Sequence, residues 1–568
     1  MAKKIGVYVC ECGNNIADSV DIARIIKTVS PMRNVKVVHK HRLLCSEDGK
    51  ESLKQSIKQH ELTHLVVAAC SPKQHEQTFM SVCLAAGLNP YLFQMTNIRE
   101  QVAWVTQDKE KATDKAIRQI AAAIARVACQ EALQKRDMDV SPNVLVIGGG
   151  IAGVRATRVL ASPSRKVYLV EKSSSLGGKV KGFDKLFTKM ESGSGLIENE
   201  LGTVEGNENA EIFTNSEVGQ ILGSFGNFEI KIVNKATSEA RDFSVGAVVL
   251  ATGFDLMNLD GLPQYGYGRL EDVYTSLEFE EMNVPGGPTD GKILLKDGRP
   301  PRSVAIIHCV GREEKGYCSK VCCMYSLKFA RMLKDKLPEV KVSELYSDLC
   351  VPGKAYQQFY EETKGLGVEF IRAEKTDVTR NGKGITVKYE SKSGLKGDLA
   401  ADMVILVPAM EPGNDTHKFA EMLGILVDSE GFLVQEHQKL APVASSVEGV
   451  FVVGCAQGPK SILESIVQSE AAAGKILSSL VPGRKLELEV KTSEISETFC
   501  TGCKTCISVC PYSAISFDDF RNIAVVNEAL CHGCGVCAAA CPSGAARVKN
   551  FAFTQIYQEV ETLLKQMK

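Results

Sequence analysis

The chain has 568 residues, of which 44% are apolar and 24% charged, as in globular proteins long enough for three or four domains. Its 67 basic and 68 acidic residues nearly cancel, so the charge gives no reason to expect nucleic acid or an anionic membrane as a partner. No run of about 18 uncharged apolar residues occurs and the N-terminus lacks the apolar core of a signal peptide, so we expect a cytoplasmic protein without a membrane span.

The chain contains 20 cysteines, and sixteen of them fall in three groups separated by long stretches with almost none. In a reducing cytosol, grouped cysteines are more often metal ligands or redox groups than disulfides. The position of each group therefore guides the functional interpretation.

Residues 1–140 are predicted to form a small α/β domain, with strands in the apolar runs 5–10, 35–45 and 63–70 and a helix over about 113–134. The first group of cysteines comes at the ends of these strands: Cys10, Cys12, Cys45 and Cys70. Because ligand sites in open α/β sheets lie beyond the carboxyl ends of the strands, these thiols are candidates for one [4Fe–4S] cluster. Four buried structural cysteines are the alternative.

Residues 141–490 are predicted to form a dinucleotide-binding domain. The segment VLVIGGGIAGVRA places glycines at the turn from a strand into a helix, whose N-terminus offers free N–H groups to a pyrophosphate. Glu171 ends the next strand, where an acidic side chain binds a ribose hydroxyl. The later segments SLGG, AVVLATGF and GVFVVGCAQGPKSI are similar to those of flavoproteins with two dinucleotide domains, which favours FAD over the alternative, NAD. The predicted cofactor residues are Gly148, Gly149, Gly150, Gly153, Glu171, Lys172, Gly177, Gly178, Thr252, Gly253, Gly454, Gln457 and Ile462.

The second group of cysteines lies where such flavoproteins carry a second glycine fingerprint for NADPH. The strand RSVAIIH runs instead into Cys309, and Cys318, Cys322 and Cys323 follow at once. With Cys309 at a strand end, Cys318 in a loop and the adjacent pair at the start of a helix, the four thiols are predicted to surround one [4Fe–4S] cluster. A reactive dithiol at Cys322 and Cys323 and a zinc site remain alternatives.

Lys328 is the predicted catalytic residue. It follows Cys323 by five residues, which on a helix is about 7.5 Å along the axis. A cation there would lie between the cluster and the isoalloxazine and would stabilise reduced flavin. The alternative is a surface lysine whose stem covers an apolar helix face. Core packing is expected for Cys83, Cys129, Cys350 and Cys455, although Cys455 follows Gly454 and could line the flavin site.

Residues 491–550 contain the third group, two C-x2-C-x2-C-x3-C-P runs. In such a pair, three thiolates of each run bind one cubane, and the fourth, before the proline, binds the other. The first cluster is therefore assigned to Cys500, Cys503, Cys506 and Cys541, and the second to Cys531, Cys534, Cys537 and Cys510. A pair of zinc sites is the alternative. Residues 551–568 are predicted to form an amphipathic helix.

The pattern YCSKVCCMYSLK, the flavin fingerprint without a nicotinamide fingerprint, and the terminal ferredoxin motif together resemble the family of heterodisulfide reductase A subunits. The segments VCECGNNI, AACSPKQHE and GLNPYLFQMTNIRE are similar to its N-terminal domain. The resemblance implies an α/β chain with a thioredoxin-reductase-like FAD domain of Rossmann type, an N-terminal α/β domain and a C-terminal two-cluster ferredoxin of bacterial type. Residues 185–221 contain no cysteine, so the ferredoxin domain that some members insert there is absent and a short form is expected.

The same resemblance implies a flavin that accepts electron pairs and sends single electrons along two routes, one to a high-potential acceptor and one to ferredoxin, or the reverse. The implied partners are proteins like the B and C subunits of heterodisulfide reductase, modules linked to hydrogenase, formate or NADH, and a second copy of the chain within a larger complex. An electron wire that does not bifurcate and a thiol–disulfide oxidoreductase remain alternatives.

Overall fold

The computed structural model describes residues 3–135, 137–382 and 384–565. The chain divides into two compact units. The first combines Met1–Met138 with Glu487–Lys568, and the second comprises Asp139–Leu486. The N-terminal domain and the ferredoxin segment, which lie at opposite ends of the sequence, therefore belong to the same unit, whereas the predicted flavin domain forms a unit of its own.

The first unit is built on a four-stranded parallel sheet in the order β2-β1-β3-β4. Its strands are β1 (Ile5–Cys10), β2 (Val35–His41), β3 (His64–Ala69) and β4 (Phe93–Asn97). Both central strands are buried along their whole length, as in parallel sheets that are covered on both faces. One face packs against α2 (Ile22–Val29) and α5 (Lys109–Val127), and the other against α3 (Glu47–Gln59) and α4 (Pro72–Ala86). All four strands point the same way, so their carboxyl ends share one edge.

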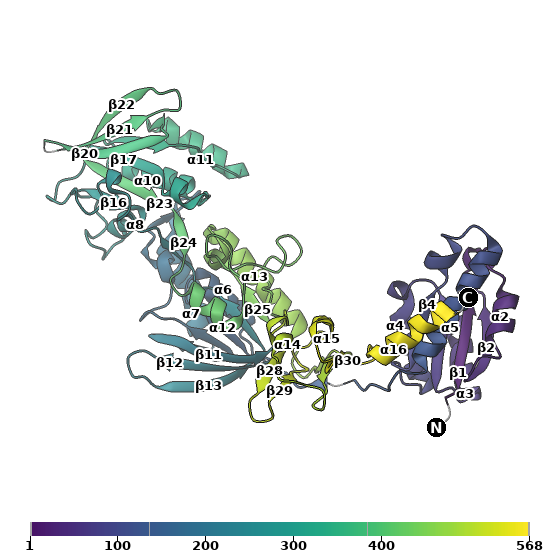
Figure 1. Cartoon of the computed structure of the whole chain (residues 1–568). Coiled ribbons are helices and arrows are strands. Elements are labelled where there is room, and N and C mark those ends of the chain that lie inside the picture. Colours follow the sequence, from purple (N-terminus) through teal and green to yellow (C-terminus); the bar gives the residue numbers. More distant parts are fainter. Residues whose placement is uncertain (1–2, 136, 383, 566–568) are drawn as a thin grey trace. The chain divides into compact units, whose positions relative to one another are not determined.

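Helix α5 ends at Val127, seven residues before the predicted end, because the following backbone finds partners outside the helix. The amide of Glu131 donates to Asn550 Oδ1 at 2.8 Å, and Leu133 O accepts from Asn89 Nδ2 at 2.7 Å. The predicted C-terminal helix is α16 (Phe553–Lys565), which lies along α5 (Figure 1). An ion pair of 2.6 Å between Arg126 Nη1 and Glu559 joins the two helices. Residues 566–568 lie outside the described part of the chain.

The ferredoxin segment consists of short elements that hold cysteine loops between them. Two antiparallel pairs form its frame: β27 (Ser493–Ile495) with β30 (Ala546–Val548), and β28 (Ile515–Asp518) with β29 (Ile523–Val526). The helices α14 (Thr505–Ser508) and α15 (Val536–Ala540) each follow the first two cysteines of one run. Such brief elements leave little apolar core, and the buried residues include cysteines of both runs, Cys506 and Cys537.

The second unit contains two five-stranded sheets. The first, in the order β10-β7-β6-β14-β25, packs on one face against α6 (Ile151–Leu160) and α13 (Ile462–Ser479) and on the other against the antiparallel sheet β11-β12-β13. Its strands are β10 (Ala210–Phe213), β7 (Val167–Val170), β6 (Val144–Ile147), β14 (Ala247–Leu250) and β25 (Val450–Val452), and the covering strands are β11 (Ser216–Ser224), β12 (Asn227–Asn234) and β13 (Ala240–Val245).

The second sheet repeats this plan in the order β16-β23-β17-β18-β19, with α8 (Ser276–Asn283) and α10 (Cys322–Lys336) on one face and β20-β21-β22 on the other. Its strands are β16 (Val273–Thr275), β23 (Met403–Pro408), β17 (Ser303–Val310), β18 (Lys341–Tyr346) and β19 (Glu369–Arg372), and the covering strands are β20 (Lys375–Asn381), β21 (Gly384–Glu390) and β22 (Lys396–Ala401). Each half of the unit thus has a helical layer, a parallel sheet and an antiparallel cover. Across the described residues, no helix combines the length and the apolar character needed to cross a bilayer.

Candidate functional site

A cavity of about 890 Å³ lies in the second unit where β6 turns into α6. The predicted cofactor residues Gly148, Gly150, Glu171, Lys172, Gly178, Thr252, Gly253 and Ile462 line it. The predicted residues Gly149, Gly153, Gly177, Gly454 and Gln457 are not part of this lining. Two of them adjoin it: the amide of Gly149 donates to Glu171 Oε2 at 2.7 Å, and a Cβ on Gly454 would lie 3.1 Å from that of Ala152.

The glycines of this turn have different surroundings. Backbone atoms pack closely against Gly148 and Gly153, whereas the space beside Gly150 is open. A Cβ on Gly148 would meet the carbonyl oxygen of Ala251 at 2.3 Å, and one on Gly153 would meet that of Gly148 at 1.9 Å. A Cβ on Gly150 meets no protein atom within 4 Å, and Gly150 is the N-cap of α6. The open space at Gly150 is therefore cavity, next to the free N–H groups that begin a helix, which suits a pyrophosphate.

Two further observations fit a dinucleotide. The Thr252 hydroxyl is buried in the cavity wall and makes no hydrogen bond within the described structure, so it is free for a ligand. The Glu171 carboxylate is only 9% exposed, and its Oε1 accepts from both the amide and the hydroxyl of Ser173. Its Oε2 accepts only from the amide of Gly149 and so has a second lone pair for a ribose hydroxyl. FAD, which would supply two-electron and one-electron chemistry, therefore fits these residues.

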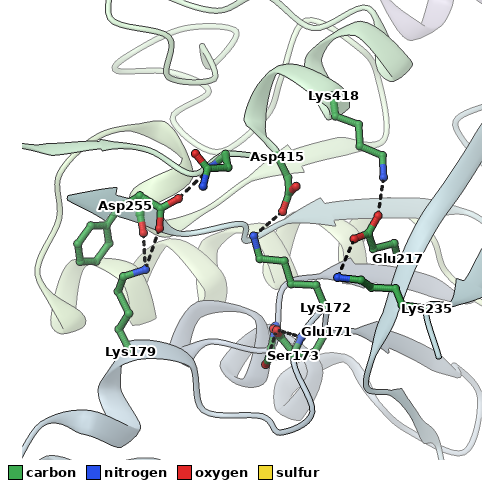
Figure 2. Close-up of polar contacts among 12 residues, drawn as sticks. Glu171, Lys172, Ser173, Lys179, Glu217, Lys235, Asp255, Asp415 and Lys418 are labelled. Carbon is green, nitrogen blue, oxygen red and sulfur yellow. Dashed lines mark hydrogen bonds and ion pairs between the residues drawn. The ribbon is translucent and has the colours of Figure 1, made fainter. Parts of the chain in front are cut away.

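Two lysines, Lys172 and Lys179, lie near Glu171 (Figure 2). Lys172 Nζ pairs with Asp415 at 2.6 Å, and Lys179 Nζ donates to the Phe254 carbonyl oxygen at 2.6 Å and pairs with Asp255 at 3.2 Å. Both lysines belong to the cavity lining. Because Lys172 pairs with Asp415, just before α12 (Thr416–Leu423), and Lys179 pairs with Asp255 of β15 (Phe254–Leu256), the two ion pairs fix these segments against the cavity lining.

Lys328 lies in the same cavity and is buried, so the alternative of a surface lysine is wrong. Its side chain is 2% exposed and forms an ion pair with Glu280, which is 5% exposed, while the ammonium lies 5.3 Å from the centroid of the Phe183 ring. Burial raises the pKa of Glu280, and the charge and hydrogen bond of Lys328 oppose that rise. Val321, Tyr325 and Phe329 of the same helix also line the cavity.

The second cysteine group lies at the start of α10. Strand β17 ends at Val310, Cys309 has a positive φ of 58°, and Cys322 and Cys323 open the helix. The amide of Cys350 donates to Cys323 Sγ at 3.3 Å, so this fifth thiol, expected only to pack, adjoins the group. Arg312 Nη1 approaches Cys309 Sγ at 4.0 Å.

Hydrogen bonds favour the ionised form of Cys318 and Cys323, whereas the same bonds and burial raise the pKa of Cys322. The Cys322 thiol lowers the pKa of Cys318 to about 6 and that of Cys323 to about 4, and the buried His308 further lowers the latter. The thiolate is the form that binds iron. Nowhere in the described ranges do three His, Cys, Asp or Glu side chains gather closely enough for a single metal ion. A cubane binds its four thiolates at separate iron corners, which are further apart.

The ferredoxin segment brings cysteines of its two runs together. One small hollow is lined by Cys510 of the first run and by Cys531, Cys534 and Cys537 of the second, which is the set assigned to one cluster. Neutral groups donate hydrogen bonds to the sulfurs: Ser493 N to Cys531 at 3.2 Å, Ala514 N to Cys510 at 3.3 Å and Ala546 N to Cys541 at 3.5 Å.

The N-terminal cysteines lie along the carboxyl edge of their sheet. Cys10 ends β1, Cys70 directly follows β3, and Cys45 comes four residues after the end of β2, which stops at His41. The chain reverses after Cys10, where Cys12 and Gly13 both have positive φ, of 51° and 60°. Burial raises the pKa of Cys10, and the charges of Cys12 and Cys45 raise it further, so the thiols are near one another.

Known protein families match the flavin domain and the ferredoxin segment separately. The pyridine nucleotide-disulphide oxidoreductase family matches residues 142–473, and the 4Fe-4S dicluster domain matches residues 499–545. A protein of Archaeoglobus profundus that is named for its likeness to the A subunit of heterodisulfide reductase is 34% identical over an alignment that covers 99% of this chain and 98% of the relative. The chain belongs to the family of heterodisulfide reductase A subunits. It is accordingly an oxidoreductase with a flavin domain and a [4Fe–4S] dicluster domain.

Members of this family differ in length. The alignment with the Archaeoglobus relative spans 690 positions, more than the 568 residues of this chain, as expected of a short form. The A subunit of the H(2):CoB-CoM heterodisulfide,ferredoxin reductase of Methanothermobacter thermautotrophicus is 34% identical over 91% of both chains. A thioredoxin reductase of T. acidophilum aligns in structure with 60% of this chain and 99% of its own, at 18% identity and a TM-score of 0.42.

Sequence reasoning did not find three charged residues at these sites. Glu280 precedes its partner Lys328 by 48 positions, and Arg99, which contacts Cys12, follows it by 87. Lys179 follows the glycine pair Gly177 and Gly178 but carries no motif. Of the three, only Glu280 gave a signal in the sequence, because it is an acidic residue on the buried face of α8. This signal does not show that Lys328 is its partner.

Proposed function

We propose that this chain is the electron-splitting component of a larger oxidoreductase, in which FAD takes up electron pairs and passes single electrons to two routes. One observation carries the proposal: helix α10 begins with Cys322 and Cys323, and the next turns of the same helix line the flavin cavity with Tyr325 and Lys328. A cluster at these thiols and a flavin in the cavity would therefore share one rigid element.

In this proposal Lys328 stabilises the reduced flavin. Splitting an electron pair requires the second electron to be more reducing than the first, so the semiquinone must be unstable relative to the oxidised and fully reduced forms. A buried cation favours the anionic fully reduced form. Glu280 holds the ammonium in place and compensates its charge when the flavin is oxidised.

The proposal includes four [4Fe–4S] clusters: two in the ferredoxin segment, one at Cys309, Cys318, Cys322 and Cys323, and one at the N-terminal thiols. The name of the Methanothermobacter relative includes hydrogen, a heterodisulfide and ferredoxin. We propose ferredoxin as the low-potential acceptor here, with heterodisulfide-reductase-like subunits as the other route and a hydrogenase-, formate- or NADH-linked module as the donor. Assembly as a cytoplasmic homodimer within such a complex is part of the same proposal.

A potentiometric titration of the FAD in the purified full-length chain tests the central claim. A splitting flavin should go from oxidised to fully reduced in one two-electron step, with almost no semiquinone signal in the electron paramagnetic resonance (EPR) spectrum. A stable semiquinone over a wide range of potential would identify the alternative, a one-electron wire. Co-purification of the native complex, with identification of its subunits, tests the proposed partners.

A thiol–disulfide oxidoreductase is disfavoured because Cys322 and Cys323 are only 4% and 1% exposed, whereas thiols that exchange with a disulfide substrate are accessible to it. If Cys322 and Cys323 formed a reactive pair instead, alkylation after reduction would label both. With a cluster in place, the native protein should resist alkylation there until the iron is removed.

A further inference from the structure

Arg99 occupies the one remaining strand end at the N-terminal thiol site. The sheet order β2-β1-β3-β4 places the predicted ligands after the first three strands in space, with Cys45 after β2, Cys10 and Cys12 at the end of β1, and Cys70 after β3. The fourth strand, β4, ends at Asn97, and Arg99 begins the short helix η1 (Arg99–Ala103) two residues later. All four strands thus contribute a group to this edge.

The guanidinium of Arg99 is hydrogen-bonded to the sulfur of Cys12, one of the four predicted ligands. Its Nη1 donates to Cys12 Sγ at 3.2 Å, and its Nε and Nη2 donate to Glu100 Oε1 at 3.2 and 2.7 Å. The guanidinium carbon lies 5.0 Å from the centroid of the Trp104 ring, and the Arg99 side chain is 20% exposed. Its contacts with Glu100 and Trp104 therefore hold a positive charge against this thiol.

The hydrogen bonds to the ferredoxin sulfurs come from neutral backbone amides, those of Ser493, Ala514 and Ala546. The N-terminal site differs from the ferredoxin sites in having a charged donor.

We infer that Arg99 sets the reduction potential of a [4Fe–4S] cluster at the N-terminal thiols. Reduction adds one negative charge to a cluster, and an N–H···S hydrogen bond from a cation stabilises that charge, which raises the potential. Glu100 partly cancels the cation and so limits the rise. The inference rests on the N-terminal cluster of the proposed function, and assigns to Arg99 a positioning and tuning role rather than a ligand role.

Three variants separate charge from packing. Arg99→Gln removes the charge and should lower the midpoint potential of this cluster. Glu100→Gln removes the opposing carboxylate, keeps the arginine and should raise the potential. Arg99→Lys keeps the charge without the forked geometry and should give a value between those of wild type and Arg99→Gln. Arg24→Gln is the matched control, because in the described structure the guanidinium of Arg24 pairs with Glu110 and Asp114 of the same domain and not with a cysteine.

The measurement is an EPR-monitored redox titration of the anaerobically purified full-length chain, with iron content determined for every variant. The N-terminal signal is assigned as the one that is lost in a Cys45→Ala, Cys70→Ala variant. Opposite shifts for Arg99→Gln and Glu100→Gln at full iron content, with Arg24→Gln unchanged, are expected. If Arg99→Gln loses iron, the test rests on the midpoint potentials of Glu100→Gln and Arg99→Lys, which should be raised and lowered relative to wild type.

Two results would overturn the inference, and they differ in kind. Unchanged potentials in all Arg99 and Glu100 variants, with the cluster present, would leave Arg99 with a structural role only. A wild-type iron content that lacks one cluster, with no signal lost in the cysteine variant, would remove the N-terminal cluster itself. That second result leaves the flavin and its neighbouring cluster, the centre of the proposed function, untouched.

Discussion

Glu280 on α8 and Lys328 on α10 form an ion pair between two side chains that are both almost fully buried, in the wall of the flavin cavity. The second carboxylate oxygen of Glu280 has no hydrogen-bond partner within the described structure. Taking two charges out of water is costly, and such pairs often stabilise a protein less than apolar residues would. The pair is therefore better explained by a requirement of the site than by stability.

Lys328→Met should destabilise the protein in a pH-dependent way. Burial raises the pKa of Glu280 and Lys328 opposes the rise, so without the lysine the pKa of this carboxyl in the folded state increases further. A group with a raised folded-state pKa favours folding while it is protonated, and that stability is lost as the pH rises through the folded-state pKa. The variant should therefore be close to wild type at about pH 5 and weaker by about 3–5 kcal/mol at about pH 8.

Urea denaturation at the two pH values measures this difference. The double variant Lys328→Met, Glu280→Gln has no uncompensated charge, so it should recover most of the loss at the higher pH. An equal loss at both pH values would mean that packing of the lysine stem, and not the charge of Glu280, causes the effect.

Gly150→Val should abolish FAD binding without unfolding the chain. Gly150 has φ of −76° and ψ of −176°, which valine adopts without strain, and a Cβ there meets no protein atom within 4 Å. The side chain would instead occupy cavity space beside the N-terminus of α6. Flavin content after purification, with circular dichroism to check the fold, gives the result.

Gly202→Val is the matched control for this substitution. Gly202 lies in α7 (Gly193–Glu205) of the same unit, is exposed, and also has no atom within 4 Å of an added Cβ. This variant should retain one FAD per chain. Full flavin in Gly150→Val would place the pyrophosphate elsewhere.

The isolated chain should not be reduced rapidly by NADH or NADPH. Although residues 142–473 match a pyridine nucleotide family, β17 contains Cys309 and is followed by Gly311 without a glycine fingerprint. The chain then passes through the short helix α9 (Arg312–Lys315) to the thiols at the start of α10, so neither helix begins in a glycine-rich turn like the one before α6. Stopped-flow absorbance of the flavin after mixing with either nucleotide tests this, and fast bleaching would restore the dehydrogenase interpretation.

Cys322→Ala should remove one cluster, whereas Cys350→Ala should not. Cys322 is buried and hydrogen-bonds to both Cys318 and Cys323, while Cys350 adjoins the group through its backbone amide, which an alanine retains. Iron content should fall by about four per chain in the first variant and stay unchanged in the second. Loss of iron in Cys350→Ala would make the fifth thiol a ligand.

Sequence patterns predicted the parts of the sites that depend on local geometry. The glycine turn, the doubled cysteine runs and the start of α10 at Cys322 each require residues at fixed short spacings, and these patterns are visible in a single sequence. The ends of helices were harder to predict. Helix α5 stops at Val127 because Asn550, far along the chain, binds the backbone of Glu131. Glu280 and Arg99 were missed for the same reason, since tertiary contacts alone bring them to Lys328 and Cys12.

Removing two N-terminal thiols should cost the chain one cluster. The sheet delivers Cys10, Cys12, Cys45 and Cys70 to one edge, and the positive φ of Cys12 and Gly13 supplies the turn that separates Cys12 from Cys10. Wild type purified without oxygen should hold about sixteen irons, and a Cys45→Ala, Cys70→Ala variant about twelve, by four irons per cubane.

Cys83→Ala is the control, because Cys83 is fully buried in the same core and burial raises its pKa to about 12, which suits a packing thiol. It should keep all sixteen irons and lose only stability. About twelve irons in wild type and in the double variant alike would show that the four thiols pack the sheet edge and bind no cluster.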